Sequence, residues 1–192
     1  MPRAYDNTNR ARDAARTTER IVAATEALLA SGPIGEVTLQ AIAAGAEVTV
    51  QTVLRHMGSR DGCFAAVGER IGARVEAQRG GTEPGDVDAA IAALIVHYEN
   101  EGRLMLNLLA QEGGSEAVPH EAAEAGRAYH RGWVVRCFRP GPHEPDAQVI
   151  DALVAATDLY VWKLLRLDLG RTVEATEAVV GRLVRSVLEA PQ

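Results

Sequence analysis

The chain has 192 residues, 47% of them apolar, which is enough for one domain of ordinary size or two small ones with a buried core. Its two cysteines, Cys63 and Cys137, stand outside any CxxC or Cys/His spacing, so we expect buried thiols rather than a metal site, a disulfide or a redox switch. No stretch approaches the ~20 apolar residues of a membrane span, and residues 1–20 lack the apolar core of a signal peptide. The composition therefore predicts a soluble, cytoplasmic protein without a membrane partner.

The net charge is −6, but the acidic residues are concentrated in the second part of the chain. Residues 1–79 contain ten arginines and nine acidic residues, a net charge of +1, whereas residues 80–192 carry −7. The first part can therefore present a local basic face to a negatively charged partner although the whole chain is acidic.

Glycine- and proline-rich segments divide the chain into stretches that favour helix. These segments are GPIGE (32–36), GSRDG (58–62), RGGTEPGD (79–86), QEGGSEAVP (111–119) and RPGPHEP (139–145). Between them no period-two alternation persists for long, so we predict an all-α protein. The charge division and the segment at 79–86 suggest two domains, over residues 1–79 and 80–192.

Four helices are expected in the first part. The first begins near Thr17 or Thr18 and ends at Gly32, and the second runs from Thr38 to about Ala44. The third begins after Thr49, and the fourth follows Ser59 and carries an apolar stripe at spacings of 3, 4 and 4, formed by Phe64, Val67, Ile71 and Val75. Short helices joined by about four residues have the geometry of a helix-turn-helix unit.

The second part continues as helices. We predict a broken helix pair over residues 86–100 and 101–112, a helix over 119–138, and two long helices over 145–169 and 172–189. The last two are apolar on more than one face, so a partner subunit is their natural cover. This predicts a homodimer through a four-helix bundle. The residues expected at its interface are Val154, Val161, Leu165, Val180, Leu183 and Val187.

The stretch EVTVQTVLRHMGSRD (47–61) is rich in β-branched residues but has no partner strand in the chain. As a helix it has a good N-cap in Thr49, and Val53 and Met57 fall on one face. The weak strand propensity costs only tenths of a kcal/mol per residue, so we interpret the stretch as a turn followed by a short helix.

The run VTLQAIAAGAEVTVQTVLRHMGSRDGCF (37–64) resembles the DNA-binding signature of TetR-type bacterial transcriptional regulators. Members of that family have a Thr-x-x-x-Ile-Ala helix start, an Ala-Gly-Val-Ser-type turn, a short recognition helix and a Ser-Lys-Glu-type start of the next helix. Four positions depart from the pattern. Glu47 replaces the glycine of the turn, Leu54 a tyrosine, Met57 a phenylalanine and Arg60 a lysine, so a left-handed residue other than glycine is expected at position 47.

The resemblance implies that the short helix enters the major groove of double-stranded operator DNA. Gln51 would pair with an adenine edge, Arg55 with guanine, and Val50 or Thr52 with a thymine methyl group. Phosphates would be held by polar groups around the two helix starts. The residues expected to contact DNA are Thr38, Gln40, Thr49, Val50, Gln51, Thr52, Leu54, Arg55, His56 and Arg60.

The arginines of the N-terminal arm, Arg10, Arg12 and Arg16, have two interpretations. They either add salt-sensitive contacts to DNA or belong to a solvated, disordered tail.

The second domain is expected to hold a mostly apolar pocket for an unknown small-molecule effector, the alternative being that the same side chains are core. Trp133 and Trp162 are the strongest candidates because a buried indole N–H needs a partner. The expected lining residues are His97, Met105, Leu109, Tyr129, Trp133, Cys137, Tyr160 and Trp162.

The sequence contains no HExxH, phosphate loop, GxGxxG or nucleophile elbow, so we expect no enzymatic activity, catalytic residue, metal or cofactor. These features together predict a dimeric transcriptional repressor that a small molecule releases from a palindromic operator. The alternative is a helical small-molecule-binding protein whose DNA-binding motif is weakened or lost through the departures at Glu47 and Leu54.

Overall fold

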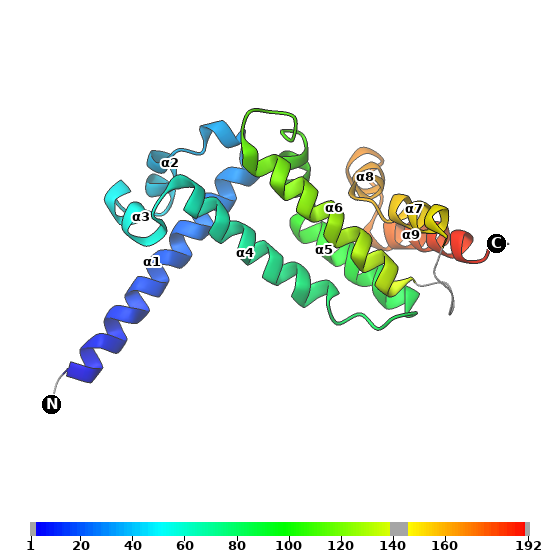
Figure 1. The fold of residues 1–192 in the computed structure, drawn as a ribbon, viewed down its shortest axis with the longest axis horizontal. Coiled ribbons are helices and arrows are strands. Elements are labelled where there is room, and N and C mark those ends of the chain that lie inside the picture. The colour runs from blue at the N-terminus through cyan, green and yellow to red at the C-terminus, as the bar shows by residue number, and fades with distance from the viewer. Residues whose placement is uncertain (1–2, 139–145, 191–192) are drawn as a thin grey trace. The chain divides into compact units, whose positions relative to one another are not determined.

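The computed structural model describes residues 3–138 and 146–190. Within these ranges every regular element is helical (Figure 1), which confirms the all-α prediction. The chain forms two compact units. Unit 1 comprises residues 1–72 and 107–120, and unit 2 comprises residues 73–106 and 121–192. The expected boundary at 79–80 falls at the end of helix α4 (Arg60–Arg79), whereas the units divide inside this helix, because α4 is long enough to contribute to both.

Unit 1 is built on α1 (Arg3–Ser31), which packs against both α2 (Leu39–Gly45) and α3 (Val50–Met57). A 3₁₀ turn, η1 (Ile34–Glu36), leads from α1 toward α2. Each fully buried aliphatic side chain of this core contributes about 1.5–3 kcal/mol. The core side chains include Ile21, Val22, Leu29, Ile34, Val37, Ile42, Val53, Phe64 and Val67.

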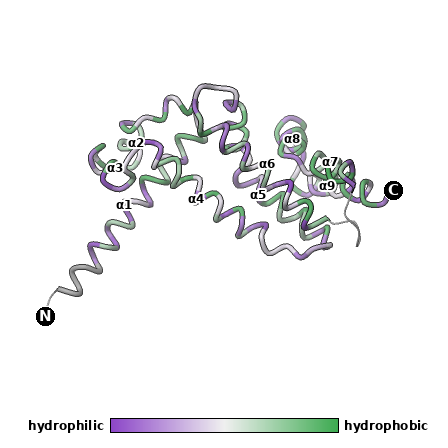
Figure 2. Tube along the Cα trace, viewed as in Figure 1, coloured by the Kyte–Doolittle hydropathy of each residue, from purple (hydrophilic) through white to green (hydrophobic). Residues whose placement is uncertain are grey.

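Helix α1 begins at Arg3, so the expected start near Thr17 or Thr18 was wrong. Residues 9–20 are mostly hydrophilic (Figure 2) and none of them is buried, so hydrophobic periodicity gave no sign of this part of the helix. Ala11, Ala14 and Ala15, with the neighbouring arginines, are nevertheless good helix formers. The arginine arm is therefore helical over the described residues rather than a disordered tail.

Unit 2 contains the C-terminal part of α4, most of α5 (Val87–Leu109) and α6 (Ala117–Cys137), and the helices that follow. The end of α5 and the start of α6 lie in the segment 107–120, which belongs to unit 1. The last helix, α9 (Val173–Leu188), packs against α7 (Ala147–Ala156) and confirms the helix expected over 172–189. No helix in the described ranges is both long enough and apolar enough to cross a membrane.

Helix α5 is continuous, so the expected break between residues 100 and 101 was wrong. Gly102, inside the helix, does not interrupt it. A Cβ at this position would lie 2.6 Å from the Trp162 ring, so glycine is required by the close approach of that ring. Gly102 is therefore needed for close packing of Trp162 and does not mark a turn of the chain.

The single helix expected over 145–169 is also wrong, because the chain breaks at Thr157 and Asp158. The Thr157 hydroxyl donates to the Leu153 carbonyl at 2.7 Å, and the Asp158 carboxylate accepts from the Tyr160 N–H at 2.8 Å, which caps a new helix. This new element is α8 (Leu159–Lys163), followed directly by a π-helical turn, η2 (Leu164–Asp168).

Candidate DNA-binding surface and effector site

Each of the two helices of the helix-turn-helix has a threonine N-cap, as was predicted for Thr49. Thr38 precedes α2 and its hydroxyl oxygen accepts from the Ala41 N–H at 3.1 Å. Thr49 precedes α3 and accepts from the Thr52 N–H, also at 3.1 Å. Because each cap uses the oxygen as an acceptor, the hydroxyl proton of Thr38 can still be donated. The Thr49 and Thr52 hydroxyls lie 2.9 Å apart, so one of them donates a hydrogen bond to the other.

The turn between α2 and α3 depends on a left-handed residue that is not glycine. Glu47 has φ 52°, as expected from its place in the pattern. Arg20 of α1 holds this turn: its guanidinium donates to the carbonyl oxygens of Ala46 and Glu47, the second at 2.9 Å. An exposed ion pair with the Glu47 carboxylate, at 3.6 Å, accompanies these bonds. A strained conformation of this kind persists only when surrounding contacts impose it.

Helix α3 divides into a buried face and an outward face. Val53 is fully buried, whereas Gln51 and Arg55 are exposed. Val50, Thr52, Leu54 and His56 are half-buried along the sides. The helix therefore anchors itself through one valine and presents an amide and a guanidinium to solvent, two groups that can read base edges in a major groove.

The junction between α3 and α4 favours glycine at two positions, at Gly58 for its backbone conformation and at Gly62 for lack of space. Gly58 ends α3 with φ 76° and donates its N–H to the Leu54 carbonyl at 2.8 Å. At Gly62 a Cβ would lie 2.0 Å from the Met57 carbonyl oxygen. This close approach fixes where the end of α3 lies against the start of α4.

Arg60 lies in a different environment from the one expected for a phosphate contact. Its Nε donates to the Val37 carbonyl at 2.8 Å and its Nη2 to the Ile34 carbonyl at 2.6 Å. Its Nη1 lies 3.3 Å from the Glu116 carboxylate, and the guanidinium stacks on the Phe64 ring at 4.8 Å from the centroid. These contacts tie the loop after α1 to the start of α4, so Arg60 acts within unit 1.

His56 also has a partner inside unit 1. Its Nδ1 lies 2.9 Å from the Thr18 hydroxyl of α1, which leaves Nε2 as the ring nitrogen available to another molecule. Gln40, at the start of α2, is exposed. Of the ten residues expected at DNA, only Arg60 has its charged group committed to contacts within the domain.

Unit 2 brings only part of the expected effector pocket together. His97, Trp133 and Cys137 are buried and Tyr129 is half-buried, whereas Tyr160 is 56% exposed. Met105 is half-buried in unit 2, and Leu109 is half-buried in unit 1. Trp162 is buried near Gly102, and its indole N–H donates to Glu99 at 2.7 Å. Trp133 donates to the Arg79 carbonyl at 3.2 Å, so both indole N–H groups have protein partners.

The structure adds Arg79 to this group of side chains. It is 2% exposed, and the sequence analysis missed it because it falls in the segment assigned as a chain breaker. A signal was present: Arg79 follows Val75 by four residues and so continues the buried stripe of α4. An arginine at an inward-facing position of a helix is a reason to look for a partner of opposite charge.

The expected dimer residues have different environments. Val180 and Leu165 are buried at 2% and 8% exposure, so the core of one chain already covers them. Val154, Val161 and Val187 are half-buried. Leu183 is 41% exposed and is one of several exposed apolar side chains on α8, η2 and α9. The other large exposed apolar residues of these elements are Tyr160, Leu164 and Val179.

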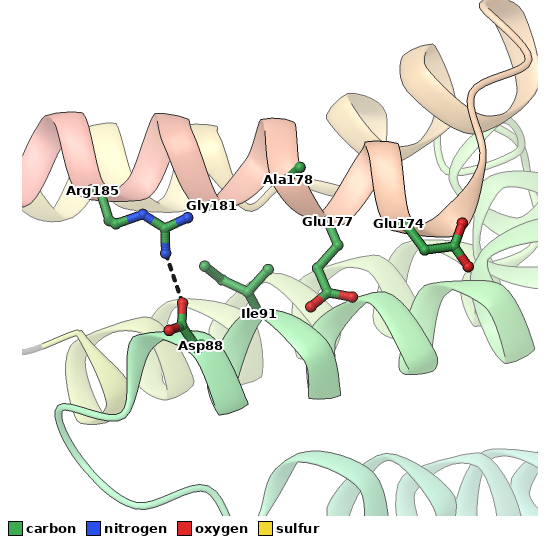
Figure 3. A pocket seen from close by; sticks show the side chains of 7 residues that line it. All are labelled: Asp88, Ile91, Glu174, Glu177, Ala178, Gly181 and Arg185. Atoms are coloured by element: carbon green, nitrogen blue, oxygen red, sulfur yellow. Dashed lines mark hydrogen bonds and ion pairs between the residues drawn. The ribbon is translucent and has the colours of Figure 1, made fainter.

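A separate pocket of about 280 Å³ lies between α5 and α9 (Figure 3). Arg185 donates to Asp88 across it at 2.7 Å. Its other lining residues are Ile91, Glu174, Glu177, Ala178 and Gly181. It contains none of the expected effector residues, and the described parts of the chain hold no cluster of three or more His, Cys, Asp or Glu side chains able to bind a metal.

Comparison with known proteins agrees with the helix-turn-helix geometry. Residues 21–67 match the family model described as "Bacterial regulatory proteins, tetR family". No curated protein matches the chain. The matched segment runs from the buried part of α1 through α2 and α3 into α4, which are the elements that hold Gln51 and Arg55 at the surface. Residues 21–67 therefore form a helix-turn-helix domain of the tetR family of bacterial regulatory proteins, which is a DNA-binding domain.

Proposed function

We propose that the protein is a homodimeric repressor that binds a palindromic operator through α3 and leaves it when a small molecule binds in unit 2. The observation that carries the DNA-binding part is the form of α3. The helix is capped by Thr49, ended by Gly58 and anchored by Val53, and its exposed side carries Gln51 and Arg55.

The side chains of α3 suggest how bases are read. The Gln51 amide can pair with the N6 and N7 of adenine, and the Arg55 guanidinium with the N7 and O6 of guanine. The methyl groups of Val50 and Thr52 can contact thymine. The Thr38 hydroxyl and His56 Nε2 would donate to phosphates and set the register without reading sequence. Arg60 is left out of this set because its Nε and Nη2 donate to the Val37 and Ile34 carbonyls.

The exposed apolar surface supports the dimer. Tyr160 and Leu164 are four residues apart, as are Val179 and Leu183, so each pair shares one side of its helix. These side chains are 56%, 50%, 38% and 41% exposed. Several large apolar side chains left exposed in this way favour an interface. A two-fold dimer would place its two copies of α3 in major grooves about 34 Å apart or a multiple of that distance.

Release by an effector requires a free-energy coupling between the two units. Helix α4 belongs to both: its first residues follow α3 in unit 1, and its last turn, with Arg79, lies in unit 2. A ligand that favours one position of that last turn would favour one position of the helix start beside α3.

The test measures binding of full-length protein to a duplex operator selected from a random library. We expect Gln51→Ala and Arg55→Ala each to lose about 1–3 kcal/mol of discrimination between the operator and its single-base variants. The control is Arg131→Ala, which removes one exposed positive charge from unit 2. The base-reading assignment fails if Gln51→Ala and Arg55→Ala keep the wild-type sequence preference.

A further inference from the structure

The core of unit 2 contains a positive charge without a counter-charge. The Arg79 side chain enters from the end of α4 and stacks over the Trp133 ring, its guanidinium carbon 4.0 Å from the ring centroid, and lies 5.4 Å from that of Tyr129. Its Nη2 lies 3.0 Å from His130 Nδ1, and its Nε–H has no acceptor. Within the described residues no carboxylate is within ion-pair distance of this guanidinium, which is unusual because buried charges are normally paired.

The hydrogen bonds of His130 show that this histidine does not neutralise the charge. Arginine can only donate, so His130 Nδ1 is the acceptor and the proton is on Nε2. Nε2 lies 3.1 Å from the Thr157 hydroxyl, which donates onward to the Leu153 carbonyl at 2.7 Å. Burial, reinforced by the Arg79 charge, lowers the pKa of His130 to about 4, so this ring is neutral and both its nitrogens are occupied.

His97 of α5 adds a second group that lacks a partner. The residue is 0% exposed, and neither of its ring nitrogens has a hydrogen-bond partner. Burial, followed by the charge of Arg79 and the ring of His130, lowers the pKa of His97 to about 3. A neutral imidazole keeps one N–H donor, and leaving such a group unpaired in a core costs free energy.

We propose that Arg79 and His97 bind the carboxylate of a small organic acid, with the rings of Tyr129 and Trp133 against its apolar body. This inference rests on the proposed function, since the acid would be the effector. The guanidinium supplies the charge and the Nε–H, and His97 supplies a neutral donor. One positive charge matches a monocarboxylate, whereas a phosphate dianion would leave a buried negative charge uncompensated.

The test uses full-length protein and three pairs of probes, which are acetate, hexanoate and benzoate with their neutral amides, at constant ionic strength. Thermal unfolding is measured for wild type and Arg79→Met. We expect at least one carboxylate, and no amide, to raise the Tm of wild type in a saturable manner. Arg79→Met should weaken that carboxylate at least tenfold, and His97→Phe should weaken it as well. Arg131→Met, at an exposed arginine of α6, should keep the wild-type response.

The stability of the unliganded variant separates a binding residue from a structural one. If the buried charge serves a ligand, Arg79→Met without ligand should unfold at the same temperature as wild type or higher, because it removes an unpaired buried charge. A lower Tm for unliganded Arg79→Met, or carboxylates that protect wild type no better than their amides, overturns the proposal. DNA is absent from this assay, so failure to bind an operator would refute the proposed function and leave the carboxylate result standing.

Discussion

Arg60 and Arg70 of unit 1 differ from Arg79 of unit 2 in their partners. In unit 1, Arg60 donates to two backbone carbonyls, and Arg70 pairs with Glu19 and Glu26 at 2.8 and 3.5 Å. In unit 2, Arg79 is more deeply buried than either, yet it has only aromatic rings and a neutral histidine beside it. Arg60 and Arg70 therefore have acceptors or counter-charges within the fold of unit 1. Unit 2 keeps an unsatisfied charge inside, where a ligand can supply what folding does not.

The two ends of α4 show the same difference between an arginine with hydrogen-bond acceptors and one without a counter-charge. Arg60 at the start holds the loop after α1, and its removal should affect stability. Replacing Arg79 at the end of α4 should leave the stability of the unliganded protein unchanged or raise it.

Acid should destabilise unit 2 through its buried histidines. The pKa of His130 is about 4 and that of His97 about 3 in the folded chain, against about 6.5 in an unfolded one. Between these values the unfolded state binds more protons, so the free energy of unfolding falls as the pH is lowered from about 6.5 toward 4. His130 alone corresponds to a change on the order of 3 kcal/mol.

This acid effect can be measured by urea unfolding at several pH values between 7 and 4.5. Replacing a histidine by a side chain that does not titrate should remove its share of the pH dependence. His130→Gln and His97→Phe should therefore each flatten the curve. An unchanged curve in both variants would show that these histidines are protonated as readily in the folded chain as in the unfolded one.

Gly62→Ala should damage unit 1 most among single methyl additions in α4. The new Cβ would meet the Met57 carbonyl at 2.0 Å, and relieving that clash must move α3 or α4 at a cost of about 3 kcal/mol. Gly68→Ala is the matched control, since nothing lies within 4 Å of a Cβ there. It should stabilise the helix by roughly 0.5–1 kcal/mol. Thermal unfolding measures the stability of both variants. Equal stability would contradict the close approach of Gly62 to the Met57 carbonyl.

Arg60→Met should lower the stability of unit 1 by about 2 kcal/mol, because two backbone carbonyls lose a charged donor. Arg55→Met, at an exposed position of α3, should change stability by no more than about 0.5 kcal/mol. Operator titrations complete the comparison. Folded Arg60→Met should keep the wild-type sequence preference and Arg55→Met should lose it. The reverse pattern would show that Arg60, and not Arg55, reads the DNA.

The turn before α3 should give the smallest effects, with opposite signs at neighbouring residues. Glu47→Gly relieves a left-handed backbone and should stabilise unit 1 by about 0.5–1 kcal/mol. Ala46→Gly, at a buried residue with right-handed φ and ψ, should destabilise it by a similar amount. Chemical denaturation of both variants is sufficient, and a loss of stability in Glu47→Gly would mean that the Glu47 side chain matters more than its backbone.

The helix-turn-helix could be predicted from the sequence because its signals are local. Thr38 and Thr49 cap the helices that follow them, and the left-handed residue at Glu47 follows from its place in the pattern. The features that were missed depend on contacts between distant residues. Gly102 resembles a helix breaker in sequence, but Trp162 packs against it. The hydrogen bonds from Arg60 to the Ile34 and Val37 carbonyls likewise have no local signal in the sequence.

For Arg79 the position was predictable from the sequence, whereas the environment was not. Its spacing from Val75 places it on the buried stripe of α4, so its position was predictable. Its environment was not, because the aromatic rings and His97 come from α5 and α6. No local pattern could show that the described part of the chain provides no carboxylate there.

The most direct test of the account is selection of bound duplexes from a random DNA library by full-length wild type and by the double variant Gln51→Ala, Arg55→Ala. Wild type should enrich a two-fold symmetric site whose half-sites are about one helical turn or a multiple apart. The double variant should fold with wild-type stability and enrich no site. Failure of folded wild type to enrich any sequence, or recovery of the same site by the double variant, would contradict the claim that α3 reads an operator.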